Sequence, residues 1–199
     1  MDGDGDLDVL VSDRKGQRRG VYWLANPGSR AVKESWKEHR IGAAAEEVMF
    51  LDVGDLDVDG HRDVLVAAKP RKVFWFAASG NPADPWTTRT IPFPDEFGTA
   101  KAVRIGDVNG DGRADLVVSC EQAAADRSGV FWLEGGRLSE PAWKAHDIAG
   151  PAGEKYDLVE LLDLDADGDL DVLTCEERDN LGVIWYENPR ATSVGASKR

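Results

Sequence analysis

The stretch Asp163-Leu-Asp165-Ala-Asp167-Gly168-Asp-Leu-Asp171, followed by Val172-Leu-Thr174, decides the fold of this chain. Its carboxylates converge on one point only if the backbone curls tightly, which the glycine at the sixth position permits by accepting a positive φ. Oxygen donors held in this way suit Ca²⁺. Because the twelfth position holds Thr174 rather than the glutamate of an EF-hand, we expect the ninth residue, Asp171, to close the site. The β-branched run that follows is typical of a strand rather than of an EF-hand helix.

The same pattern, D-x-[DN]-x-D-G-x-x-D, recurs along the chain. Complete copies begin at Asp55 and Asp107, and a copy without its first position starts at Asp2. We expect about one Ca²⁺ per loop, up to four, with the first site incomplete. Solvated polar turns are the alternative, but like-charge repulsion in four such loops disfavours them unless a cation is bound. The candidate metal ligands are Asp2, Asp4, Asp8, Asp55, Asp57, Asp59, Asp63, Asp107, Asn109, Asp111, Asp115, Asp163, Asp165, Asp167 and Asp171.

Composition indicates a globular chain. The 199 residues are 42% hydrophobic and 31% charged, which is enough for a core, and no apolar run is long enough to predict membrane insertion. Four bound Ca²⁺ would change the net charge from −13 to −5, so much of the acidity belongs to the loops. Without a basic stripe, nucleic acid is not an expected partner. Two cysteines, Cys120 and Cys175, are too few for a disulfide framework, and whether they are bonded stays open.

Three further elements repeat with the loops. Strands of the type Val21-Tyr-Trp23-Leu carry tryptophans spaced by 52, 57 and 53 residues. A W-x-x-[HR]-x-I strand follows in three copies, and a short apolar strand such as Leu51-Asp-Val53 precedes each complete loop. Four short antiparallel strands in a period of this length are typical of a β-propeller blade. The tryptophan strand is apolar on both faces, as expected where one blade packs between two others.

These motifs resemble the FG-GAP/VCBS repeat family of calcium-loop β-propellers, which also form the heads of integrin α-subunits. The resemblance implies that each loop joins the innermost strand of a blade to the second, and that ligands meet the opposite face. We therefore predict an all-β propeller segment of about four four-stranded antiparallel blades, the first and last incomplete, giving 14 strands where four complete blades need 16. We expect one domain over 1–190, a disordered tail over 191–199, and repeats over 1–46, 47–98, 99–155 and 156–190.

Several charged positions are candidates for functional residues. Asp52, Arg104 and Glu160 share one place on the innermost strands, where we expect pairing across a central channel rather than ligand binding. His39 and His146 share a slot with Arg89, which argues against a zinc ligand or a general base because arginine serves as neither. Charged turns opposite the calcium loops are the expected place for a glycan or protein ligand.

The sequence contains no nucleophile elbow, P-loop, H-E-x-x-H or CxxC motif. We expect a non-enzymatic calcium-binding scaffold for carbohydrate or protein binding and adhesion. The alternative is the propeller part of a carbohydrate-active enzyme, of polysaccharide lyase or sugar dehydratase type. Weak calcium loops suit calcium-rich surroundings, so we expect the parent protein to be extracellular or in the cell envelope. The chain starts inside a loop without a signal peptide, which suggests a fragment, and self-association to complete the propeller is a further expectation.

Overall fold

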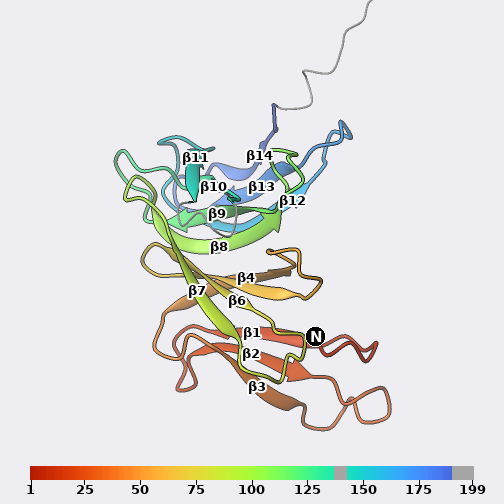
Figure 1. The fold of residues 1–199 in the computed structure, drawn as a ribbon. Helices are drawn as coiled ribbons and strands as arrows, with labels where there is room; N and C mark the ends of the chain where they lie inside the picture. Colours follow the sequence, from red (N-terminus) through yellow and green to blue (C-terminus); the bar gives the residue numbers. More distant parts are fainter. Residues whose placement is uncertain (137–142, 190–199) are drawn as a thin grey trace, which may run out of the picture.

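The protein consists of stacked antiparallel sheets. The structure is a computed structural model that describes residues 1–136 and 143–189, and within these residues it contains strands and no helix. The four sheets are stacked in chain order; Figure 1 shows the first sheet at the bottom, the second above it, and the third and fourth overlapping at the top. Within the described residues the sheets do not close into a ring. The predicted all-β fold of blade-like sheets is confirmed, and the predicted tail over 191–199 lies outside the described residues.

Each sheet is a meander in which neighbouring strands in the chain pair with each other. The first sheet comprises β1 (Val9–Asp13), β2 (Gly20–Ala25) and β3 (Lys37–Gly42). The second comprises β4 (Val48–Gly54), β5 (Asp63–Ala68), β6 (Lys72–Ala77) and β7 (Thr87–Pro92). The third comprises β8 (Thr99–Gly106), β9 (Asp115–Glu121), β10 (Val130–Glu134) and β11 (Lys144–Asp147). The fourth comprises β12 (Tyr156–Leu162), β13 (Asp171–Glu176) and β14 (Gly182–Tyr186).

The described residues contain the 14 strands that the repeat predicts. The first sheet has no strand before its acidic loop, and in the described part of the chain the fourth sheet ends at its tryptophan strand. The first strands of the other three sheets, β4, β8 and β12, lie beside one another and form the inner side of the stack. In this arrangement the acidic loops lie at one end of the strands of each sheet.

Apolar side chains fill the space between neighbouring sheets. Trp23 of the first sheet packs with Phe74 and Phe76 of the second, whereas Trp75 points the other way and packs with Phe131 of the third. The second sheet's tryptophan strand, β6, is therefore buried on both faces, as its two apolar faces predict. This packing aligns the sheets and so fixes where the loops and turns of one sheet stand relative to the next.

Both cysteines are free thiols. Cys120 is buried in the core between the second and third sheets, and this burial raises the pKa of its thiol far above the ordinary value. Cys175 on β13 is half-buried. Cys120 thus acts as a small hydrophobic side chain in the core.

No helix long and apolar enough to cross a membrane occurs in residues 1–136 and 143–189.

Candidate metal centre

The acidic loops join the first and second strands of the sheets. They connect β4 to β5, β8 to β9 and β12 to β13, and the truncated copy leads into β1. Each loop curls because two positions adopt left-handed backbone conformations. The sixth position is always glycine, as expected, but the fourth position is left-handed as well, a requirement that sequence reasoning missed. The fourth positions are Gly3, Val58, Gly110 and Ala166, with φ between 59° and 79°, and the sixth are Gly5, Gly60, Gly112 and Gly168, with φ between 84° and 97°.

The carboxylate at the first position organises this curl. Its two oxygens accept hydrogen bonds from the backbone N–H groups of the fifth and sixth positions, at 2.9–3.1 Å in all three complete loops. The aspartate at the fifth position accepts from the N–H of the seventh, at 2.8–3.2 Å. Backbone donors therefore hold the acidic side chains in place along the inside of the turn.

The aspartate at the ninth position has a second task that the sequence did not reveal. One oxygen of Asp63 accepts from the backbone N–H of Leu56 at 3.1 Å, inside the loop, and the other accepts from Ala78 at 3.1 Å, just beyond the tryptophan strand. Asp115 makes the same pair of bonds to Val108 and Gly135, and Asp171 to Leu164 and Asn188. This buried carboxylate ties the loop to the end of the third strand.

In the first loop the chain terminus takes part in the equivalent contacts. Asp8 accepts from the backbone N–H of Asn26 at 2.8 Å, just beyond β2, and pairs with the N-terminal ammonium of Met1. Burial alone would raise the pKa of Asp8, but the ammonium group and the Asn26 N–H outweigh it and lower that pKa. Asp2 and Asp4 form the exposed outer turn of this loop.

Two of the predicted ligand sets contain three carboxylates that meet. In the second sheet, one oxygen each from Asp55, Asp57 and Asp63 lie within 4.8 Å of one another. In the fourth sheet the group consists of Asp163, Asp165 and Asp167. These are the two such groups of three among the described residues, so Asp59 and Asp171 stand outside them.

The third loop differs because its third position is the amide Asn109 and its fifth position is paired. Asp111 accepts from Arg113 at 2.5 Å, and this contact lowers the pKa of the Asp111 carboxyl. Asp107 accepts from the N–H groups of Asp111 and Gly112, as its counterparts do. The loop has the shared backbone form with less uncompensated charge.

Electrostatics in the second loop favour a bound cation. Burial, followed by the neighbouring charge of Asp59, raises the pKa of Asp57, and burial also raises the pKa of Asp63. Asp57 Oδ1 is buried and has no hydrogen-bond partner among the described residues, while Arg89 lies 3.9 Å from the other oxygen. A buried carboxylate oxygen without a donor is costly unless a cation or water completes its shell. The donor set therefore fits a hard divalent ion.

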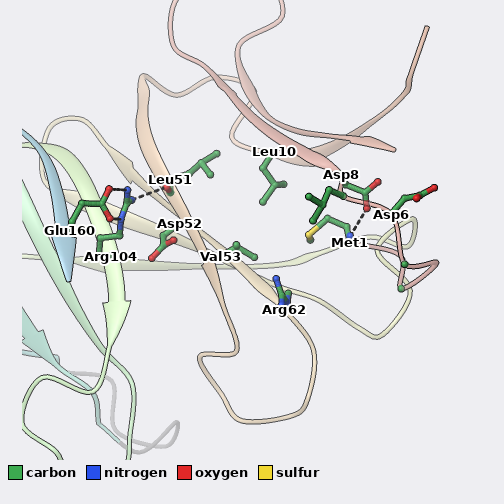
Figure 2. A pocket seen from close by; sticks show the side chains of 13 residues that line it. Met1, Asp6, Asp8, Leu10, Leu51, Asp52, Val53, Arg62, Arg104 and Glu160 are labelled. Carbon is green, nitrogen blue, oxygen red and sulfur yellow. Dashed lines mark hydrogen bonds and ion pairs between the residues drawn. The ribbon is translucent and has the colours of Figure 1, made fainter. Parts of the chain in front are cut away.

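Next to the first loop, an open cavity of about 730 Å³ lies between the N-terminal segment and the inner strands (Figure 2). Figure 2 shows Arg104 joined to Glu160 and to the carbonyl of Leu51, with Asp52 beside them. The guanidinium and carboxylate form two hydrogen bonds, at 2.6 and 3.0 Å, which raise the pKa of Arg104 and lower that of Glu160. Arg104 and Glu160 are thus paired, as expected, whereas the Asp52 carboxylate accepts a hydrogen bond from the backbone N–H of Ile105 at 3.0 Å.

At the opposite end of the strands, ion pairs connect neighbouring sheets. Lys69 contacts Glu121 and lies 3.7 Å from Glu47, while Lys101 lies 3.4 Å from both Glu121 and Asp157. Burial alone would raise the pKa of Glu121, but the two lysines outweigh it and lower that pKa. The turns around this line of charges, such as 121–127, reach solvent.

The histidines of the outer strands stack on tryptophans. His39 lies on Trp23 with ring centroids 4.3 Å apart, and His146 lies on Trp132 at 4.2 Å. In the second sheet the Arg89 guanidinium lies 4.2 Å from the centre of the Trp75 ring. A planar group that covers an indole is the shared requirement, which explains why histidine and arginine exchange at this position.

Taken together, the stacked meanders and the nine-residue acidic loops define a propeller-type repeat protein, with candidate cation sites in the loops at one end of its strands. The FG-GAP-like repeat matches residues 1–66 and 55–118, more than half of the chain, and the chain belongs to this repeat family. No curated protein matches the sequence.

Proposed function

We propose that this chain is a calcium-binding β-propeller scaffold, from a protein of the cell exterior or cell envelope, that binds glycans or proteins through the turns opposite its acidic loops. One observation carries the calcium part. Asp57 places a buried, unpartnered oxygen in a loop where three carboxylates approach within 4.8 Å of one another. Membership of the FG-GAP-like repeat family supports the scaffold.

The loop residues would divide the work of holding the ion. In the second sheet Asp55, Asp57 and Asp63 would supply oxygen ligands. In the fourth sheet Asp163, Asp165 and Asp167 would do so. In the third loop the amide oxygen of Asn109 would be a ligand as well. Bound Ca²⁺ would supply positive charge that offsets carboxylate repulsion. In the three complete loops the ninth-position aspartates stay bonded to two backbone N–H groups, so they hold the loop in shape. In the second sheet Asp63 also places a carboxylate oxygen at the site.

Binding of Ca²⁺ would link the first and second strands of a sheet and stabilise the folded state by mass action, by about 2.7 kcal/mol per site at a hundredfold excess over Kd. The proposed ligand would then bind the turns at the opposite end of the strands. There, ion pairs such as Lys69 with Glu121 keep adjacent sheets in register. A rigid stack with exposed turns is suited to recognition rather than to chemistry.

Calorimetric titration with Ca²⁺, alongside thermal unfolding in calcium and in EDTA, tests the metal sites. We expect heat of binding, a higher melting temperature in calcium, and loss of one site in Asp57→Asn. The matched control is Asp126→Asn, an exposed aspartate in the 121–127 turn, which should leave both results unchanged. Equal melting curves in calcium and in EDTA would refute the calcium sites.

A glycan array, followed by analysis of the bound sugars, tests the binding role. Retention of intact glycans supports a binding scaffold. Release of unsaturated or dehydrated sugars would instead show an enzyme and contradict the proposal.

A further inference from the structure

The three complete acidic loops differ most in charge at their seventh position. It holds His61 in the second sheet, Arg113 in the third and Asp169 in the fourth. The second loop contains four aspartates, the third contains three because Asn109 takes one place, and the fourth contains five. The loop with the fewest carboxylates is therefore also the one that carries a permanent cation at this position.

The side chain of Arg113 turns back onto the aspartate two residues before it. Its Nε and Nη2 atoms donate to Asp111 Oδ2 at 3.1 and 2.5 Å, and its backbone N–H donates to Asp111 Oδ1 at 2.9 Å. Both oxygens of the fifth-position carboxylate thus accept hydrogen bonds from a single residue. Hydrogen bonds between ionised groups are the stronger kind, so the guanidinium holds this carboxylate and offsets its charge.

The fourth loop has no such contact. Its oxygens from Asp163, Asp165 and Asp167 lie within 4.8 Å of one another, and no described lysine, arginine or histidine forms an ion pair with these three carboxylates. In the second loop the Arg89 guanidinium lies 3.9 Å from Asp57, which is beyond hydrogen-bonding distance. The third loop is thus the one complete loop, in the described part of the chain, in which an arginine is hydrogen-bonded to a fifth-position aspartate.

The backbone of the third loop nevertheless has the same form as the others. Asp107 accepts from the N–H groups of Asp111 and Gly112 at 3.0 and 2.9 Å, as the first-position aspartates of the other two loops do. The amide of Asn109 accepts from the N–H of Asp111 at 2.8 Å, and Asp165 makes the equivalent bond in the fourth loop at 3.2 Å. The third loop therefore differs from its sister loops in charge rather than in shape.

Given the proposed calcium sites, we propose that Arg113 is a built-in counter-ion that competes with Ca²⁺ for Asp111 and makes the third loop the weakest of the three complete sites. An incoming ion must share Asp111 with the guanidinium or displace it, whereas the fourth loop offers carboxylates without a paired cation. Because the pair is partly exposed, its competition corresponds to about a fivefold change in affinity. Over a range of calcium concentrations the second and fourth loops are then loaded while the third is held by its arginine.

A calcium titration of the full chain followed by amide NMR tests this role, because the sixth-position glycine of each loop reports on its own site. The N–H groups of Gly60, Gly112 and Gly168 donate to the first-position carboxylates, so each signal should shift when its loop binds the ion. We expect Gly112 to reach half of its shift at a calcium concentration at least about fivefold higher than the other two glycines.

Substitutions in two loops separate pairing from net charge. Arg113→Ala should lower the calcium midpoint of Gly112 about fivefold, and His61→Arg, which places the same cation in the second loop, should raise that of Gly60 about fivefold. The matched control is Arg62→Ala, which removes an exposed arginine of the second loop that forms no ion pair with a described carboxylate. This control should change the midpoint of Gly60 by less than about twofold, because exposed charges that are not in contact are screened.

Two results would overturn the role of Arg113 while leaving the calcium sites in place. The first is a Gly112 midpoint equal to those of Gly60 and Gly168. The second is a Gly112 signal whose response to calcium is the same in Arg113→Ala as in the unaltered chain. If that variant does not fold, the failure of His61→Arg to raise the Gly60 midpoint is decisive instead. Glycine signals that do not respond to calcium in any of the three loops would refute the calcium sites themselves.

Discussion

At the residue scale, the two aspartates Asp57 and Asp63 of one loop have opposite roles. Asp63 is fully buried and accepts two backbone hydrogen bonds, so the fold uses both of its oxygens. Asp57 holds a buried oxygen without a described partner, and its pKa is raised by burial and by Asp59. The ninth position is structural even without an ion, whereas the third is unfavourable without one.

The substitutions Asp63→Asn and Asp57→Asn should therefore have different effects on the free energy of unfolding when it is measured in EDTA. Asp63→Asn places an amide donor against a backbone N–H and should cost about 1–3 kcal/mol in the free energy of unfolding. Asp57→Asn removes an uncompensated buried charge and should leave stability equal or higher. In saturating calcium, Asp57→Asn should become destabilising. Urea unfolding in both buffers measures this, and equal losses for the two variants in EDTA would contradict the division of roles.

Val58 occupies the fourth position of the second loop with a φ of 59°, although β-branched residues disfavour that region. Its side chain is 75% exposed, so it contributes little packing to offset the strain. Glycine would relieve about 1–2 kcal/mol of backbone strain at this position. This gain exceeds the free-energy cost of the extra conformational entropy that glycine gives the unfolded chain, so Val58→Gly should raise stability by up to about 1 kcal/mol.

The reciprocal change in the third loop is the control for Val58→Gly. Gly110 holds the fourth position there with a φ of 63°, and Gly110→Val should lower the melting temperature. A loss of stability in both variants would show that φ at this position does not govern the loop.

At the element scale, the outer strands are joined to the sheets by stacking as well as by backbone pairing. Because the requirement is a planar group over the indole, His39→Arg should be tolerated, whereas His39→Ala should cost about 1 kcal/mol. His61→Ala, in an exposed loop position, should change little and serves as the control. Urea unfolding of the three variants decides the matter, and an arginine variant as weak as the alanine variant would exclude stacking as the cause.

The sequence predicts the strands well because the apolar alternation and the acidic loops repeat in register. It does not predict that His39 lies on Trp23, since that contact depends on how 11 residues between β2 and β3 fix the register of the two strands. Nor does it show that Asp63 bonds to Ala78, because the donor is 15 positions away and reaches the carboxylate only after two strands have formed. Local patterns encode elements, while these contacts arise from pairing between them.

At the scale of the whole molecule, the proposed calcium sites would make stability depend jointly on calcium and pH. In the metal-free fold the pKa values of Asp57, Asp63 and Asp115 are raised, mainly because these carboxyl groups are buried. A folded pKa above the unfolded value means that the folded chain binds more protons in the interval between the two, so metal-free stability from these groups rises as the pH falls toward about 4. Calcium would have to displace those protons, so its stabilising effect should shrink over the same interval.

The difference in melting temperature between calcium-loaded and EDTA-treated protein should therefore be largest near neutral pH and should decrease steadily as the pH approaches about 4.5. The carboxylate of Glu176, for example, does not obscure this result. Burial alone would raise the pKa of Glu176, but the backbone N–H groups of Lys155, Arg178 and Asp179 outweigh it and lower that pKa. The stability that Glu176 contributes is lost as the pH falls, but equally in both forms, so it cancels in the difference. Scanning fluorimetry across this pH range measures the effect, and a difference that stays constant with pH would show that the acidic loops are not where calcium acts.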